Sequence, residues 1–312
     1  MIPVVYDNII FTLQRNGGIS VVWNELLRRA RADQEIDLTE LDYTTQRRWM
    51  ERYRVPDFKA SAPTVFHSSY FRVLPQQGVQ NITTVHDLTY HLYRHGLAKA
   101  VHLWEEERAL QHSEAIICVS EHTKRDLLHF YPWVKAEQVH VIYNGVGEEF
   151  VPLPSVEKKG YLLYIGNSQV PYKRFDVAQE VARLTGLELK TAKNVSREEL
   201  NRMYNEALCL LYPSDYEGFG LPILEAQKAG CPVIAQNTSS IPEVIGPDGL
   251  MVKHDTLPKM AEEMAAIVKQ LMSRPTDAIV QAGLKNVQRF SWDKTYAQTK
   301  QVYENIYYNH HL

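Results

Sequence analysis

Strand-like apolar segments alternate with helical patterns along most of the chain, and this alternation constrains the fold more than any other feature. In the first half, the strand-like segments are residues 4–13, 64–66, 82–85, 116–119 and 139–142. Apolar residues at helical spacing lie between several of them, notably at 98–112 and 121–130. Strands that alternate with helices predict parallel sheets covered by helices on both faces. We therefore expect an α/β fold with doubly wound parallel sheets.

The alternation lapses once, between residues 144 and 159, where glycines and prolines precede a charged stretch. It then resumes, with strands expected at 161–165, 187–192 and 208–212 and helices at 175–184 and 196–207. A chain of 312 residues is long enough for two domains of roughly 150 residues each. We predict a first domain over 1–147 and a second over 148–295. A terminal helix, about 296–312, can pack back on the first domain.

Two predicted helices of the second half carry end signals, and a third has an aromatic stripe. Pro222 opens a predicted helix over 222–229, and Gly230 ends it. Ser240 and Glu243 have the spacing of a capping box and predict another short helix. A long helix is expected over 291–308 with a buried aromatic stripe. The aromatic residues of that stripe are Trp292, Tyr296, Tyr303 and Tyr307.

Composition excludes several classes of protein. Lys and Arg total 34 and Asp and Glu total 37, so the net charge is −3. The chain therefore lacks the excess of positive charge that is typical of nucleic-acid-binding proteins. The apolar runs are too short to cross a bilayer, and we expect no export signal. Cys118, Cys209 and Cys231 lie in apolar runs without C-x-x-C spacing, which predicts buried reduced thiols. A cytoplasmic protein without a membrane span is expected.

The densest candidate site is the segment 214–226, which follows a predicted strand and opens a predicted helix. The backbone amides from Gly218 to Leu221 precede the helix, where the helix dipole favours an anion such as a diphosphate. Glu217 and Glu225 flank these amides, and carboxylates accept hydrogen bonds from sugar hydroxyls. The alternative is a tight turn with a surface glutamate on either side.

Residues 217–226, Glu-Gly-Phe-Gly-Leu-Pro-Ile-Leu-Glu-Ala, resemble the E-x7-E signature of the family 4 retaining glycosyltransferases. Further segments resemble this family in the expected order and cover most of the chain: 10–20, 66–70, 84–88, 119–121, 143–146 and 161–167. The segments 66–70 and 84–88 are most similar to the mannosyltransferase-like members. The resemblance implies the GT-B fold, in which two Rossmann-like domains face each other across a cleft. It also implies that the second domain holds a nucleotide-sugar donor and the first an acceptor.

The same resemblance implies roles for individual residues. Glu217 corresponds to the carboxylate that meets the donor sugar, Lys173 to the phosphate-binding lysine and His86 to a histidine that approaches the sugar. These three are the candidate catalytic residues. The residues expected to bind the donor are Gly17, Gly18, Lys173, Arg174, Gly218, Phe219, Gly220, Leu221 and Glu225, with Glu225 on the ribose.

Independent readings of these residues leave alternatives. Lys173 and Arg174 precede the helix expected at 175, where cations and amides can meet an anion together, although a solvated helix start has the same pattern. A lone histidine such as His86 is also common as a structural residue. His86, His91 and His95 give a metal alternative, since the last two have the i, i+4 spacing of some zinc sites. Since no Asp-x-Asp occurs, we expect neither a metal nor a cofactor beside the donor.

Three features depart from the family or add to it. Asn167 stands where many members have an arginine, and Arg174 is expected to compensate. A single strand separates the helices at 175 and 196, so the nucleotide base is placed loosely near residues 193–196. The segment 46–54 interleaves Arg47, Arg48, Arg52 and Arg54 with Trp49 and Tyr53. It suits an anionic lipid headgroup or a lipid diphosphate, although a solvated helix face is the more common origin of such a pattern.

The sequence thus predicts a retaining glycosyltransferase that moves a hexose from a GDP- or UDP-sugar, with GDP-mannose preferred, to a glycan or lipid-linked glycan. Resemblance implies attack from the front face of the sugar without an enzymic nucleophile, and a place in bacterial surface polysaccharide synthesis such as O-antigen, lipopolysaccharide or capsule. Peripheral contact with the cytoplasmic face of the inner membrane is compatible with the arginine-rich segment. The alternatives are a sugar-nucleotide epimerase and a non-catalytic binding subunit.

Overall fold

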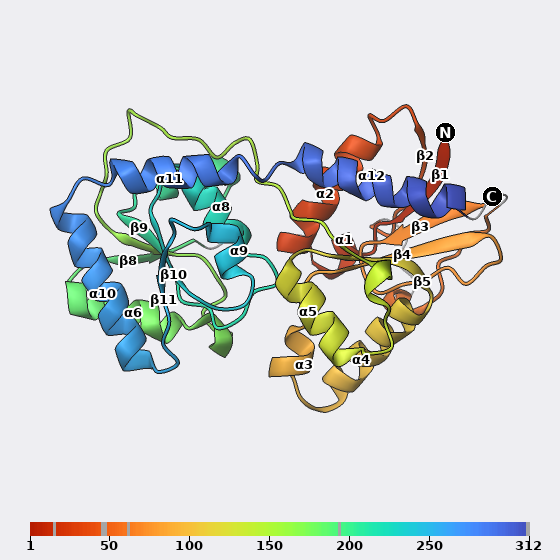
Figure 1. The fold of residues 1–312 in the computed structure, drawn as a ribbon, viewed down its shortest axis with the longest axis horizontal. Helices are drawn as coiled ribbons and strands as arrows, with labels where there is room; N and C mark the ends of the chain where they lie inside the picture. The colour runs from red at the N-terminus through yellow and green to blue at the C-terminus, as the bar shows by residue number, and fades with distance from the viewer. Residues whose placement is uncertain (15–16, 45–48, 61–62, 193–194, 310–312) are drawn as a thin grey trace. The chain divides into compact units, whose positions relative to one another are not determined.

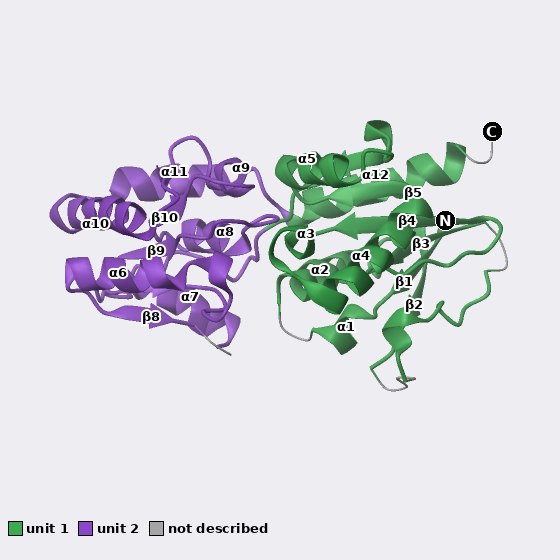
Figure 2. Cartoon of the chain, turned by 90° about the horizontal axis from the view of Figure 1, so that it is seen from below, with its two compact units in different colours: residues 1–145, 292–312 green, residues 146–291 purple. Residues whose placement is uncertain are grey.

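The computed structural model describes residues 1–14, 17–44, 49–60, 63–192 and 195–309. The chain forms two compact units, which Figure 2 shows in different colours: unit 1 comprises residues 1–145 and 292–312, and unit 2 comprises residues 146–291. The sequence pattern places the boundary after residue 147. In the structure, the chain passes from unit 1 to unit 2 after Gly145 and returns at Trp292.

Unit 1 is built on a parallel sheet whose six strands, among the described residues, follow the order β2-β1-β3-β4-β5-β6 (Figure 1). The strands are β1 (Ile2–Asp7), β2 (Ile36–Leu41), β3 (Thr64–Ser68), β4 (Val79–Val85), β5 (Ser113–Cys118) and β6 (Val139–Val141). Strand β3 is buried along its whole length, as expected for a central strand with helices on both faces of the sheet.

The helices of unit 1 come from both ends of the chain. They are α1 (Ile10–Leu13), α2 (Gly18–Ala30), α3 (Thr89–Tyr93), α4 (Gly96–Gln111), α5 (Glu121–Phe130) and α12 (Trp292–Asn309), with 3₁₀ turns η1 (Glu51–Tyr53) and η2 (Ala136–Gln138). The predicted terminal helix is present as α12 and begins at Trp292. Trp292, Tyr296 and Tyr303 of the predicted stripe are buried, whereas Tyr307 is partly exposed.

Buried hydrogen bonds join helix α12 to the sheet of unit 1. The Tyr303 hydroxyl lies 2.9 Å from the Tyr6 hydroxyl of β1 and 2.6 Å from Nδ1 of His67 in β3. Nε2 of His67 in turn lies 2.8 Å from the Thr84 hydroxyl of β4. Since buried polar groups are costly without partners, this network fixes the position of α12 on three strands.

Unit 2 has a parallel sheet of five strands among the described residues, in the order β11-β10-β9-β7-β8. Its strands are β7 (Leu162–Tyr164), β8 (Leu189–Thr191), β9 (Cys209–Tyr212), β10 (Val233–Gln236) and β11 (Leu250–Val252). Its helices are α6 (Phe175–Thr185), α7 (Arg197–Glu206), α8 (Leu221–Lys228), α9 (Ile241–Ile245), α10 (Leu257–Ser273) and α11 (Asp277–Val287), with the 3₁₀ turn η3 (Pro171–Lys173). Helices α6 and α10 pack side by side (Figure 1).

The two sheets share one winding pattern. In each unit, the second strand in sequence lies outside the first, and the later strands continue on the other side of the first. The order in which strands are added to the sheet therefore reverses between β1 and β3 in unit 1 and between β7 and β9 in unit 2. Open α/β sheets bind ligands beyond the carboxyl ends of their strands at such a switch point. The predicted doubly wound fold is confirmed in each unit, and both switch points become candidate sites.

Some local predictions are wrong. The strand expected over 4–13 ends at Asp7, and residues 10–13 form the short helix α1. Periodicity alone does not distinguish a strand from a buried helical turn in so short an apolar run. Ile10, in the first position of α1, is buried as it would be in a strand. The prediction of buried thiols is confirmed, since Cys118, Cys209 and Cys231 are buried and form no disulfide.

Candidate functional site

The ammonium of Lys173 and the carboxylate of Glu217 meet at the switch point of unit 2. Lys173 ends η3, after β7, and Glu217 lies in the loop after β9, the neighbour of β7 in the sheet. Lys173 Nζ donates to Glu217 Oε2 across 2.6 Å. The Glu217 side chain is 9 % exposed, and the buried Tyr212 hydroxyl lies beside its carboxylate. Its Oε1 has no hydrogen-bond partner of ordinary geometry among the described residues. A ligand hydroxyl would satisfy this oxygen, since a buried acceptor without a partner is costly.

Two hydroxyl side chains after β10 hold the backbone around Glu217. The Thr238 hydroxyl donates to the carbonyl of Asp215 across 3.2 Å, and the Ser239 hydroxyl accepts from the amide of Glu217 across 2.9 Å. Ser239 has a φ of +50°, a left-handed conformation that is rare for serine. Strained residues of this kind cluster at functional sites.

Ser240 continues this support and corrects a prediction. Its hydroxyl donates to the carbonyls of Glu217 and Phe219, each across 2.9 Å. The predicted capping box is therefore wrong: α9 begins after Ser240, but the serine side chain makes no cap hydrogen bond. Three consecutive hydroxyl residues between a strand and a proline-started helix are the signal in the sequence that could have revealed this support.

Helix α8 begins directly after the Glu217 loop. Gly220 precedes it with a φ of +109°, and a Cβ at this position would lie 3.3 Å from Ile223 Cδ1, so a side chain here would be both strained and crowded. Leu221 is the first helical residue, and Pro222 follows it where no backbone donor is needed. This helix start therefore presents amides and the positive end of a helix dipole next to the Lys173–Glu217 pair.

Glu225 lies in the second turn of α8 and is 7 % exposed. Its Oε2 accepts from the Tyr204 hydroxyl across 3.1 Å, and its Oε1 lies 3.7 Å from Nη2 of Arg197. Burial raises the pKa of Glu225, while Arg197 and Tyr204 oppose this shift. The carboxylate is thus held in place at a helix beside the candidate site, and ribose hydroxyls would compete with Tyr204 and Arg197 for it.

Arg174 follows Lys173 directly but turns to other partners. Its φ is +50°, and its guanidinium donates to Asp215 Oδ1 and Asp176 Oδ1 across 3.2 and 3.3 Å. The structure therefore ties Arg174 to the loop before Glu217. Asn167 accepts from the amide of Gln169 across 3.0 Å within a turn. The expected base region, 193–196, lies partly outside the described residues, because 193 and 194 are not described.

The switch point of unit 1 holds a pocket of about 210 Å³, roughly the share of seven water molecules at about 30 Å³ each. The residues that line it lie mainly in the segments after β1, β3 and β4 and include Gln14, Ser69, Tyr70, His86, Tyr90 and His102. Burial lowers the pKa of His86 to about 4, so its imidazole is neutral near pH 7. A neutral imidazole both donates and accepts hydrogen bonds, as recognition of a hydroxyl requires.

One wall of this pocket is an ordered network of polar and aromatic side chains. Arg52 Nε donates to Glu105 Oε1 across 2.9 Å, and Arg52 Nη2 donates to the Tyr70 hydroxyl across 2.7 Å. The same hydroxyl lies 3.0 Å from His102 Nδ1, and the His102 ring stacks on Tyr90 with centroids 3.6 Å apart. The pocket thus offers an aromatic face and fixed hydrogen-bonding groups, which are typical of a small-molecule site.

Of the arginine-rich segment, residues 45–48, with Arg47 and Arg48, lie outside the described residues. Arg52 points inward to the pocket network, so it does not belong to a solvated face. Arg54 is exposed and donates to the carbonyl of Trp49. Within the described ranges, no helix has both the length and the apolar character to cross a membrane.

Gly17 and Gly18 lie at the start of helix α2. Gly17 is the residue before the helix, with an extended φ of 171°, and Gly18 is its first residue. The preceding residues 15 and 16 are outside the described part of the chain. The position at a helix start suits phosphate binding, but the role of the two glycines stays a prediction.

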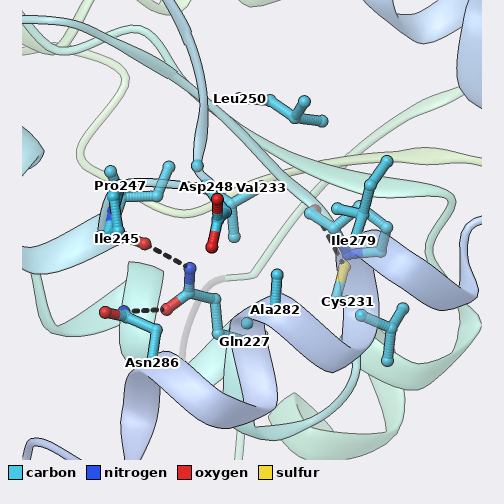
Figure 3. Close-up of a pocket in the computed structure, with 15 residues that line it drawn as sticks. Gln227, Cys231, Val233, Ile245, Pro247, Asp248, Leu250, Ile279, Ala282 and Asn286 are labelled. Atoms are coloured by element: carbon cyan, nitrogen blue, oxygen red, sulfur yellow. Dashed lines mark hydrogen bonds between the residues drawn. The ribbon is translucent and has the colours of Figure 1, made fainter.

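A second cavity, shown in Figure 3, lies under the loop between α9 and β11 and next to α11. Its volume of about 30 Å³ is close to that of one water molecule. The Gln227 side chain donates to the carbonyl of Ile245 across 2.8 Å and accepts from Asn286 across 2.8 Å, as the dashed lines in Figure 3 mark. These bonds join α8, α9 and α11, so the cavity is a packing feature.

The histidines of the metal alternative have other surroundings. His91 Nε2 lies 2.9 Å from Glu106 Oε2 and 3.2 Å from the Tyr131 hydroxyl. In the portion of the chain that the structure describes, no three His, Cys, Asp or Glu side chains group so that they could hold a metal ion. The structure therefore gives His91 a structural partner and does not bring it together with His86 and His95 as ligands.

Two family models match the chain in consecutive parts. The model "Glycosyltransferase Family 4" matches residues 43–150, and the model "Glycosyl transferases group 1" matches residues 165–285. The O-antigen chain mannosyltransferase B of Escherichia coli is 26 % identical over 293 residues, which cover 77 % of this chain and 74 % of that protein. The second match contains Lys173, Glu217 and Glu225.

Solved structures with the same fold have low sequence identity. Sucrose-phosphate synthase from Thermosynechococcus elongatus has a TM-score of 0.73 at 16 % identity, covering 99 % of this chain and 100 % of that one. HepE of Anabaena, solved with UDP and glucose, has a TM-score of 0.65 at 12 % identity and coverage of 97 % and 99 %. With the two parallel sheets, these likenesses show a Rossmann-like fold in each unit and the GT-B architecture.

Proposed function

We propose, from the premise that this chain belongs to the family 4, group 1 glycosyltransferases, that it transfers a hexose with retention from a nucleotide-diphosphate sugar to a glycan or lipid-linked glycan. The observation that carries the proposal is the Lys173–Glu217 pair at the switch point of unit 2. The pair combines a cation for a diphosphate with a buried carboxylate oxygen that has no partner among the described residues. A hydroxylated anion satisfies both groups at once.

Departure of the nucleotide is the step that unit 2 would assist. The anomeric C–O bond breaks through an oxocarbenium-like transition state, and negative charge grows on the diphosphate. Lys173 and the amides at Gly220 and Leu221 would stabilise that charge, where one preorganised donor is worth on the order of 3 kcal/mol. The acceptor oxygen bonds to the anomeric carbon on the face that the nucleotide leaves, and its proton passes to the departing phosphate oxygen. No enzymic nucleophile is then needed.

Glu217 and Glu225 would hold the two ends of the donor. The open Oε1 of Glu217 would accept from a hydroxyl of the sugar, and Glu225 would accept from the ribose hydroxyls. Arg174 would contribute to diphosphate binding by positioning the loop before Glu217, because its guanidinium donates a hydrogen bond to Asp215. Cations and amides supply this site with the positive charge that a divalent ion provides elsewhere, so we propose a metal-independent reaction.

The pocket of unit 1 suits an acceptor sugar. Its volume is about 210 Å³, and the stacked Tyr90 and His102 rings border it. His86 would contact a sugar hydroxyl as a neutral imidazole, because burial lowers its pKa to about 4. Gly17 and Gly18, at the start of α2, would contribute backbone amides to the phosphates.

GDP-mannose is our preferred donor, with UDP-sugars as the alternative. The Escherichia coli relative is an O-antigen chain mannosyltransferase, and HepE was solved with UDP and glucose. The same relative supports a role in bacterial surface polysaccharide synthesis. A thermal-shift screen of GDP, UDP, GDP-mannose and UDP-glucose tests the donor, because a ligand that binds the folded state raises the melting temperature.

Release of free nucleotide diphosphate tests the reaction. With the stabilising donor and a panel of mannosylated acceptors, we expect GDP or UDP release that depends on the acceptor and persists in EDTA. NMR of the product should show the anomeric configuration of the donor. An epimerase would convert the nucleotide sugar without this release, and a binding subunit would bind nucleotide without turnover. Either result would refute the proposal.

A further inference from the structure

A series of hydrogen bonds connects the terminal helix α12 to the pocket of unit 1. It runs from the Tyr6 hydroxyl of β1 to Tyr303 of α12, and then through the two ring nitrogens of His67 to the Thr84 hydroxyl of β4. The first three side chains are at most 1 % exposed, whereas Thr84 is partly exposed and lines the pocket. We call these four residues the Tyr303 network. It leads from the interior of unit 1 to the candidate acceptor site.

The sheet places the strand residues of this network on one face. Tyr6 pairs with His67 across β1 and β3, and His67 pairs with Ile82, two residues before Thr84 on β4. Since side chains alternate between the two faces along a strand, Thr84 lies on the same face as His67. Helix α12 packs against β1 and β3 (Figure 1), and Tyr303 thereby reaches His67.

The imidazole of His67 is confined and uncharged. The rings of Trp23 and Tyr303 pack against it edge-on, with centroids 5.1 and 5.7 Å away. Burial lowers the pKa of His67 to about 3, so the ring is neutral near pH 7. A neutral imidazole has one N–H and one acceptor nitrogen. The tautomer of His67 therefore decides the direction of every hydrogen bond in the Tyr303 network.

One tautomer gives every buried proton of the network an acceptor. With the proton on Nε2, Tyr6 donates to Tyr303, Tyr303 donates to Nδ1, and Nε2 donates to Thr84. With the proton on Nδ1, that nitrogen donates to Tyr303, and one of the two tyrosine hydroxyl protons is left without an acceptor within the described residues. Both tyrosines are buried, and a buried donor without an acceptor is costly. The network therefore favours the proton on Nε2.

This tautomer leaves the Thr84 hydroxyl with an unused proton. Its oxygen accepts from His67, and no second partner of this hydroxyl lies within the described ranges. We infer that Thr84 donates a hydrogen bond to an oxygen of the acceptor sugar, and that Tyr303, through His67, is the positioning residue that directs it. This role rests on the proposed function of the pocket as the acceptor site. His86 lines the same pocket two positions later, so both side chains would contact one sugar.

The tautomer of His67 is the first test, and it requires no assay of transfer. NMR of protein with isotope-labelled histidine distinguishes a proton on Nε2 from a proton on Nδ1. The His67 signal is identified as the histidine signal that changes most in Tyr303→Phe. We expect the proton on Nε2 in the unmodified chain. A proton on Nδ1, or a charged His67 ring near pH 7, overturns the inference.

Binding of methyl α-mannoside, a minimal mannosylated acceptor, is the second test and is measured by isothermal titration calorimetry. Thr84→Val keeps the branched shape of the side chain but removes the donor, so it should weaken binding on the order of tenfold. Thr84→Ser retains a hydroxyl and should recover most of the affinity. Tyr303→Phe keeps Thr84 but no longer directs its proton, so it should weaken binding about threefold.

Monodeoxy analogues of the same glycoside locate the oxygen that Thr84 contacts. One analogue should bind the unmodified chain about tenfold more weakly than methyl α-mannoside does. Thr84→Val should bind these two glycosides equally, because the hydrogen bond that the analogue lacks is already absent in this variant. A merely structural role of Thr84 would weaken every analogue by the same factor, and that result overturns the inference.

Nucleotide diphosphate release separates this inference from the proposed function. In the expected case, Thr84→Val raises the acceptor KM about tenfold with a smaller effect on kcat. Glycoside binding through Thr84 without any release would refute transfer and leave the contact between Thr84 and the sugar standing. Release with an acceptor KM that Thr84→Val does not alter would refute the contact and leave transfer standing.

Thr83→Val is the matched control. Thr83 precedes Thr84 on β4 and faces the other side of the sheet, where its hydroxyl lies 2.7 Å from that of Ser113. This variant should bind the glycoside as the unmodified chain does, and melting temperatures show whether each variant is folded. If Thr84→Val does not fold, the His67 tautomer and Tyr303→Phe still decide the inference. Unchanged binding in Thr84→Val, equal loss in Thr83→Val, or no glycoside binding by the unmodified chain overturns it.

Discussion

The two units each contain a buried cluster of charges, and the clusters differ in how completely they are paired. In unit 1, Arg72 donates to Asp7 and Glu51, each across 3.2 Å, and the three side chains are 2 %, 0 % and 1 % exposed. Asp7 also accepts from the Ser68 hydroxyl across 2.7 Å. In unit 2, Lys173 is 22 % exposed beside Glu217.

The difference separates a structural cluster from a ligand site. The Arg72 cluster satisfies its charges internally and joins β1 to the turn η1, so it leaves nothing for a ligand. At Glu217, Oε1 has no hydrogen-bond partner in the described part of the chain, although the side chain is buried. Burial of a charge alone therefore does not indicate function. At Glu217 the open oxygen lies beside the ammonium of Lys173 and the start of helix α8, and it is this combination that suits a hydroxylated anion.

Breaking the closed cluster should have the largest effect. Arg72→Met leaves Asp7 and Glu51 buried without their cation and should lower the free energy of unfolding by about 3–5 kcal/mol. Urea denaturation measures this change. Arg183→Met is the control, because its ion pair with Glu180 is on the surface, and should alter stability by less than about 0.5 kcal/mol. Equal stabilities of the two variants would show that the cluster is not structural.

Breaking the open pair should affect activity and spare the fold. Glu217→Gln should lower kcat on the order of 100- to 1,000-fold, the loss typical of a group that acts on the transition state. Nucleotide diphosphate release gives the rate, and urea denaturation should give a stability within about 1 kcal/mol of the unmodified chain. Full turnover in this variant would remove Glu217 from the site, whereas Glu180→Gln should retain it.

Removing the cation of the open pair tests diphosphate binding. Lys173→Ala should weaken GDP or UDP binding by about 1.5–3 kcal/mol, the value of a charge-assisted hydrogen bond. Isothermal titration calorimetry measures the dissociation constant. Lys159→Ala is matched as a lysine paired with a glutamate, Glu206, and should bind as the unmodified chain does. Unchanged affinity in Lys173→Ala would contradict the assignment.

The smallest effect is expected from the support of the open pair. Ser240→Ala removes two hydrogen bonds to the Glu217 loop and should lower kcat about tenfold with little change in nucleotide affinity. Restoring a hydroxyl with Ser240→Thr should recover part of the rate. If Ser240→Ala lowered stability but left kcat unchanged, the serine would be structural only.

Local patterns in the sequence were sufficient to predict the class of fold and to identify the segments that form the candidate site. The spacing of apolar residues and the turn residues depend only on neighbours along the chain. Helix α5 is therefore predicted with its observed bounds, and the strands β7 and β9 are predicted to within one residue at each end. The Glu217 segment was identifiable for the same reason: its glycines, proline and glutamates are adjacent. Residues 10–13 show the limit, because one apolar run suits two conformations.

Partners distant in the sequence depended on the tertiary structure. Lys173 reaches Glu217 because β7 and β9 are neighbours in the sheet although β8 lies between them in sequence. The Ser240 hydroxyl bonds to that loop rather than to its own helix, because β9 and β10 are neighbours in the sheet. The burial of His102 and Glu105 in α4 likewise follows from partners on other elements. Sequence alone therefore determined which elements form and where their loops lie; sheet order decided which side chains meet, because it sets distances that no local pattern encodes.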